Sequence, residues 1–249
     1  MLSLQNFNLR SLSVKSTAEL AIIVIGVLLA LSADGWWVNQ QERAEEAEIL
    51  QAMAEDFSVS EELVGDELNI LSEILDDLKT LSEGSAGGVA QIDDALFIKM
   101  LHNGLWEVPV LTVQMSAYNE ILGSGRMRLI NDPALRRALA EYDQDFIAAS
   151  ARLSDVFQHQ QTKLDPYLLS NFQMSQFSPF ALKQNGSAAQ LETPTRPLDH
   201  RPLLDDDVLQ NLIASKYYLL ANTQVFAREL LQSLDEIGAM LGGNSIGVE

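Results

Sequence analysis

The sequence predicts an all-α protein with one N-terminal transmembrane helix, followed by an antiparallel helical bundle that contains a long proline-containing loop. Residues 20–31 form an apolar run, and the chain after it repeats apolar residues at three- and four-residue spacing. That spacing is typical of one buried face of a helix. No stretch shows the strict apolar–polar alternation of a half-buried strand.

Residues 18–38 have the length of a membrane anchor. At about 1.5 Å per residue they span about 31 Å, close to the ~30 Å hydrocarbon core of a bilayer. Glu19 and Asp34 then lie near the two interfaces, and Trp36 and Trp37 supply an aromatic belt. The alternative is a cleaved signal peptide, with Ala30-Leu31-Ser32 as its cleavage site. We favour the retained anchor, because a long helical pattern directly follows the two tryptophans.

Basic residues near the anchor predict its orientation. Arg10 and Lys15 precede it, whereas Arg43 is the nearest basic residue on the other side. The positive-inside tendency therefore predicts a cytoplasmic stub at 1–17 and an extracytoplasmic domain at 39–241. The expected location is the bacterial inner membrane, with most of the chain in the periplasm.

Composition excludes several classes of function. The formal net charge is −19, which argues against nucleic acid as a partner, because phosphates require a basic surface. The chain has no cysteine, so disulfides, thiolate metal sites and cysteine nucleophiles are excluded. Its three histidines are scattered. We therefore predict no metal, no cofactor and no catalytic residue.

The anchor carries a face of small residues. Gly26, Ala30, Ala33 and Asp34 fall on one side of a helix, together with Trp37. Small side chains let a second helix approach closely, so we predict a helix–helix contact in the membrane at this face. The alternative stays open that small residues are simply common in anchors and that Asp34 lies in interfacial water.

The bundle is predicted from apolar stripes and from the residues that begin and end helices. Gly123-Ser124-Gly125 ends one helix, and Asp132 and Pro133 begin the next. Residues 164–204 hold five of the seven prolines and are expected to be irregular, whereas 242–249 form a flexible tail. The predicted helices cover residues 39–82, 93–101, 112–122, 133–163 and 205–241.

Two parts of the chain resemble a known family. Residues 19–31 read ELAIIVIGVLLAL and precede Trp36 and an acidic helix, and residues 122–130 read LGSGRMRLI. These motifs resemble those of bacterial single-pass membrane proteins whose domain has no assigned function. The family pattern usually has Asn-Asn-Trp where this chain has Asp34-Gly35-Trp36-Trp37. The resemblance implies a helical anchor protein and supplies no catalytic residue.

Arg126 and Arg128 are the candidate ligand-binding residues of the bundle. Guanidinium groups bind anions, so these two arginines predict a small anion site, although pairing with the protein's own carboxylates is the alternative. Asp205-Asp206-Asp207 is interpreted as the start of a helix rather than a calcium loop. We expect a non-enzymatic accessory or scaffold protein that binds other envelope proteins or a second copy of itself. The alternative is a small-ligand sensor.

Overall fold

The computed structural model describes residues 9–177 and 197–244. Every regular element in these ranges is helical, which confirms the all-α class. Short 3₁₀ and π turns connect the α-helices. The α-helices are α1 (Leu9–Leu81), α2 (Asp94–Leu101), α3 (Ser116–Ser124), α4 (Pro133–His159), α5 (Asp165–Asn171) and α7 (Asp207–Asn244).

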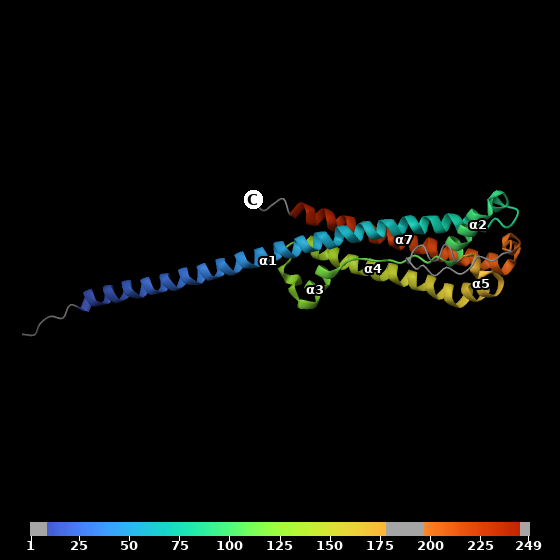
Figure 1. Cartoon of the computed structure of the whole chain (residues 1–249). Helices are drawn as coiled ribbons and strands as arrows, with labels where there is room; N and C mark the ends of the chain where they lie inside the picture. Colours follow the sequence, from blue (N-terminus) through green and yellow to red (C-terminus); the bar gives the residue numbers. More distant parts are fainter. Residues whose placement is uncertain (1–8, 178–196, 245–249) are drawn as a thin grey trace, which may run out of the picture.

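Helix α1 is a single rod of 73 residues, about 110 Å at 1.5 Å per residue. It continues through Gly35, and it ends before Gly84, whose φ of 80° suits glycine. Its N-terminal part projects far beyond the other helices (Figure 1). The first buried side chain after residue 21 is that of Ile49. The same helix therefore forms both the projecting arm and one wall of the packed domain.

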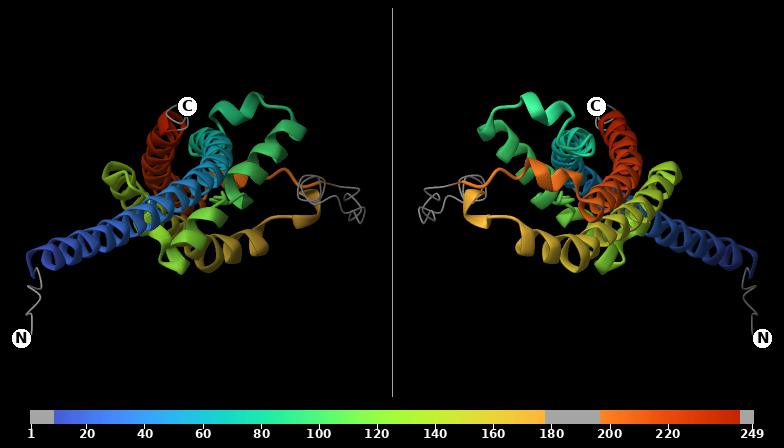
Figure 2. Two further views of the ribbon diagram at one scale, coloured as in Figure 1. Left: turned by 90° about the vertical axis from the view of Figure 1, so that its left-hand side faces the viewer. Right: turned by 90° about the vertical axis from the view of Figure 1, so that its right-hand side faces the viewer.

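Helix α7 runs in the opposite direction along α1 (Figure 1). The amide of Gln224 donates to the hydroxyl of Ser72 at 2.9 Å, and the amide of Gln210 donates to the carbonyl of Leu81 at 3.2 Å. Later residues of α7 therefore lie beside earlier residues of α1, so the two helices are antiparallel. The end-on views show the other helices gathered around the cyan part of α1, while its blue part projects away from them (Figure 2). The rings of Phe57 on α1 and Tyr142 on α4 lie 5.3 Å apart.

The predicted heptad stripe of α1 supplies its buried face. Phe57, Val64, Leu71 and Leu78 are all at most 2 % exposed. Burial of such side chains contributes about 1.5–3 kcal/mol each. The core forms two clusters along the long axis, one around Phe57 and Tyr142 and the other around Leu71 and Leu78. The spacing of the sequence pattern therefore identified this core face.

The connection between α2 and α3 departs from the prediction. Its residues 107–115 are extended and lie along α1, so α3 begins at Ser116 rather than near residue 112. Two side chains of α1 bind the backbone of this segment: Glu67 accepts from the Val110 N–H at 2.7 Å, and Ser60 bonds the backbone of Gln114. Asp56 accepts from the Ala117 N–H in the first turn of α3 at 2.7 Å. These bonds satisfy backbone groups that a helix would otherwise satisfy internally.

The C-terminal boundaries also differ from those predicted. The region expected to be irregular from residue 164 begins with α5, which a π turn at Gln160–Leu164 joins to α4. Helix α7 passes through Gly242 and Gly243 and ends at Asn244. Residues 178–196 of the proline-containing loop, 245–249 of the tail and 1–8 of the stub lie outside the described residues.

Candidate functional site: the projecting helix and the polar contacts of the bundle

The projecting part of α1 exposes a continuous apolar surface. Ile22, Leu29 and Trp37 are 70, 66 and 66 % exposed, and their neighbours are similar. An exposed apolar surface of this extent marks an interaction with a membrane or a partner. By length and composition α1 is able to cross a membrane, although a signal sequence meets the same test.

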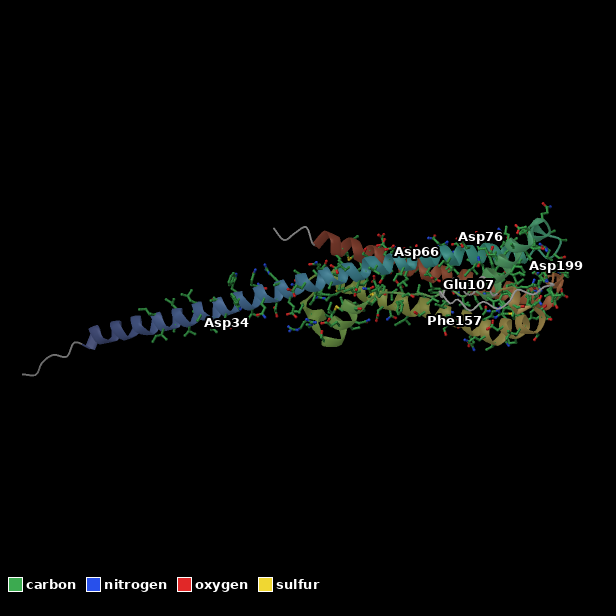
Figure 3. The ribbon with its side chains drawn as sticks, viewed as in Figure 1. Asp34, Asp66, Asp76, Glu107, Phe157 and Asp199 are labelled. Atoms are coloured by element: carbon green, nitrogen blue, oxygen red, sulfur yellow. The ribbon has the colours of Figure 1, made fainter. Side chains whose placement is uncertain are left out.

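The predicted contact face lies entirely on this arm. Gly26, Ala30, Ala33 and Asp34 are exposed, and Figure 3 shows Asp34 on the arm, away from the packed domain. A Cβ atom added at Gly26 would meet no atom within 4 Å. No described residue of the same chain packs against this face, so the contact with a second helix stays a prediction.

The structure brings Arg126 and Arg128 close to acidic residues of α1. Arg126 lies 3.0 Å from Glu45 and 2.5 Å from Glu120, and Arg128 lies 3.8 Å from Glu42. The hydrogen bond that Arg126 donates to Glu45 is the largest of the contributions that raise the pKa of the guanidinium. These pairs attach the turn after α3 to α1. An incoming anion would compete with the carboxylates for Arg126, so the anion site remains a prediction.

The packed domain contains a buried lysine that the sequence analysis did not single out. Lys216 of α7 has no exposed surface. Its ammonium donates to the carbonyls of Leu105 at 3.0 Å and Glu107 at 2.8 Å. Burial lowers the pKa of Lys216 to about 7, against the smaller opposing effects of the Asp165 and Glu107 charges.

Two π turns meet at this lysine. The first, His102–Trp106, carries the Leu105 carbonyl, and the second, Gln160–Leu164, carries a glutamine amide that donates to the same carbonyl at 2.9 Å. The Gln160 amide also lies 2.6 Å from the Asp165 carboxylate. One π turn thus supplies the buried acceptor and the other supplies one of its two donors, while Lys216 supplies the second donor. These bonds link α7, α4 and the turn after α2.

A sequence signal for Lys216 exists. It follows Ile213 by three residues and precedes Leu220 by four, so it occupies a core position of the α7 stripe. A lone lysine in such a stripe indicates a buried amine. The π turns have no comparable signal, because their residues also suit an α-helix or a loop.

The end of the domain farthest from the arm holds a second polar group. His200 is 1 % exposed and lies 2.7 Å from the Gln176 side chain, and burial lowers the pKa of its imidazole. Arg201 pairs with Asp94 at 2.9 Å and with Asp199 at 3.1 Å. These contacts join α2 to the turn before α7, and the partners of the arginine are all internal.

The acidic run at 205–207 opens a helix, as predicted. Asp206 accepts from the Val208 N–H at 2.7 Å at the start of α7, and Asp205 accepts from the Ser85 N–H at 2.9 Å. The bonds to Ser85 hold the pKa of Asp205 below its usual value. Within the described ranges, no three histidines or acids are grouped so as to hold a metal ion.

Comparison of the chain with protein families, curated proteins and solved structures finds no match. The resemblance to the family of bacterial single-pass proteins therefore stays a prediction.

Proposed function

We propose that the chain is a single-pass membrane protein of the bacterial inner membrane, with a cytoplasmic N-terminus and an acidic periplasmic domain. In this proposal an antiparallel helical bundle follows the transmembrane helix. The bundle has no enzymatic role and serves as an accessory or scaffold that binds other envelope proteins. The observation that carries the proposal is the exposed apolar arm of α1, which needs a bilayer or a partner to cover it.

The continuity of α1 supports a domain held at the membrane surface. Glu42, which pairs with Arg128, follows Val38 by four residues, about 6 Å along the helix. The packed domain therefore begins almost where the span would end. A rigid connection of this kind fixes the height of the domain, as a scaffold requires.

Charge supports a protein partner with a basic surface. Residues 1–38 contain two basic and two acidic side chains, so the whole net charge of −19 falls on residues 39–249. Complementary charge accelerates the encounter between proteins. Asp66 and Asp76 lie on the outer side of α1 (Figure 3), where a partner can reach them.

The small-ligand sensor was predicted at Arg126 and Arg128. The carboxylates of Glu45, Glu120 and Glu42 lie against these guanidinium groups. A sensor at this position would have to break those ion pairs, so the scaffold is the function that we favour.

The test uses the full chain with a C-terminal tag, extracted from its native membrane in mild detergent. Intact-complex mass measurement gives the stoichiometry. The variant D66K/D76K tests whether the acidic surface of α1 contributes to partner binding. We expect a second protein at fixed stoichiometry, bound more weakly by the variant. A matched variant, D66N/D76N, separates loss from reversal of charge. A chain that is only monomeric or self-associated would contradict the scaffold.

A further inference from the structure

A cavity opens between the 107–115 segment, α3 and α4. Its volume is about 640 Å³, within the ~300–1,000 Å³ range of small-molecule sites. Leu63 of α1 and Met115 contribute apolar surface, and Gln114 and Asn119 contribute amides. Helical proteins often build ligand sites between facing helices in this way.

Aromatic rings form one wall of the cavity. Tyr118, Tyr142 and Phe146 line it. The Tyr142 and Phe146 rings stack at 6.3 Å with 13° between their planes, and Tyr118 meets Tyr142 edge-on at 6.2 Å. The neighbouring core ring of Phe57 holds both tyrosines, at 6.5 Å from Tyr118 and 5.3 Å from Tyr142. The wall is therefore rigid and rich in π-electrons.

The Tyr142 hydroxyl is an unsatisfied polar group beside this cavity. The residue is 1 % exposed, and its hydroxyl has no hydrogen-bond partner among the described residues. Buried hydroxyls nearly always have a partner, because an unpaired one loses its hydration. The hydroxyl of Tyr118 makes only a long bond, 3.4 Å, to the carbonyl of Leu139. The Tyr142 hydroxyl oxygen is itself buried behind the wall, whereas the Phe146 ring is partly exposed.

Asp143 gives the cavity its charge. It is the only charged residue among those that line the cavity. Within the described part of the chain, no hydrogen bond or ion pair engages its carboxylate. After burial, its charge is the next cause that raises the pKa of both tyrosine hydroxyls. The potential at the aromatic wall is therefore negative.

We propose that this cavity binds a small organic cation, an ammonium group on an apolar body. The Asp143 carboxylate would pair with the ammonium, and the partly exposed ring of Phe146 would contact the apolar body and the cation. The negative charge of the whole domain concentrates cations near the opening.

Other ligand classes fit the cavity less well. An anion would meet Asp143 without any basic side chain to balance it. A neutral ligand would leave the Asp143 carboxylate unpaired. The cavity belongs to the packed domain, so this proposal goes beyond the scaffold function and does not depend on the membrane anchor.

The test is titration calorimetry on the full-length protein in neutral detergent at pH 7, with three probes of one shape: benzylammonium, benzyl alcohol and benzoate. We expect saturable one-to-one binding of benzylammonium, with the other two at least about tenfold weaker, a difference of about 1.4 kcal/mol. Equal binding of benzyl alcohol, or no saturable heat with benzylammonium, would overturn the proposal.

Variants locate the site. D143N removes the charge and should weaken benzylammonium binding by about tenfold or more. F146L replaces the partly exposed aromatic ring with an aliphatic side chain, so it should bind more weakly. E141Q, an exposed acid on the same helix that does not line the cavity, is the matched control. Unchanged affinity in D143N, with its melting temperature intact, would place the binding elsewhere and refute the assignment.

Discussion

Ser60 and Gln114 exchange two hydrogen bonds, both of 2.8 Å. The Ser60 hydroxyl donates to the Gln114 carbonyl and accepts from the Gln114 N–H. One side chain on α1 thereby satisfies both backbone groups of a residue that belongs to no helix or strand. The extended 107–115 segment is fixed on α1 at this point, and it forms one edge of the cavity that we assign to an organic cation.

The variant S60A should destabilise the fold. It leaves both part-buried backbone groups of Gln114 without their partner, so the cost is below the about 1–3 kcal/mol of a fully buried unsatisfied group. Urea unfolding of the full chain in detergent measures the change. S58A, at an exposed position two residues earlier, is the control and should change stability little. Equal stability of the two variants would show that the paired bonds contribute nothing.

Lys216 should make stability depend on pH. Its pKa is about 7 in the folded state and near 10.5 in the unfolded state, so the unfolded state binds more protons between these values. Stability should therefore rise as the pH increases from 7. The raised pKa values of the buried tyrosines make the stability fall as the pH increases above about 10. The test interval is therefore about pH 7–9.

The variant K216M should remove this rise, because its side chain carries no titratable group. K163M, at an exposed lysine, should retain the rise. Thermal melting at a series of pH values measures both variants. A wild-type melting temperature that stays level across the interval would contradict the burial of a titrating amine at Lys216.

Asp77 should destabilise the fold at neutral pH. Burial raises its pKa to about 6, against a hydrogen bond from Asn103 that lowers it. The folded state therefore binds the proton of Asp77 more tightly than the unfolded state does. The stability that the protonated carboxyl contributes is lost as the pH rises through about 6. D77N should raise the melting temperature at pH 7, whereas D76N, on the exposed neighbour, should not. A fall in the D77N melting temperature at pH 7 would refute the assignment.

The small-residue face of the arm should promote association in membranes. G26L places a large side chain where a second helix would approach, so it should weaken association. V27L adds volume on a different side of the same helix and should leave association unchanged. Energy transfer between labelled chains in vesicles measures the effect. Equal association of G26L and the wild type would contradict the prediction that a second helix packs on this face.

Residues that act within one helix could be predicted from the sequence. Asp132 caps a helix as expected, accepting from the Ala134 N–H at 2.8 Å. The end of α3 was also predictable, because Gly125 adopts a φ of 69° that suits glycine. Capping and turns depend on near neighbours, which the sequence shows directly.

Contacts between distant segments could not be predicted. The bonds from Ser60 to Gln114 and from Lys216 to Leu105 join residues more than 50 positions apart. The Ser60 bonds replace the internal bonds of a helix, so α3 begins later than predicted. The bond to Leu105 gives the Lys216 ammonium a partner in the core. The cation cavity arises in the same way, since the three aromatic residues that line it belong to α3 and α4.

Labelling of single cysteines tests the membrane anchor most directly, because the natural chain has none. The variants S11C and S58C place one thiol in the stub and one on the packed domain. With a membrane-impermeant maleimide on intact spheroplasts, we predict that S58C is labelled and that S11C is labelled only after lysis. Intact mass should show the full chain. Labelling of S11C in intact spheroplasts, or a mass lacking residues 1–32, would contradict an anchored protein with a cytoplasmic N-terminus.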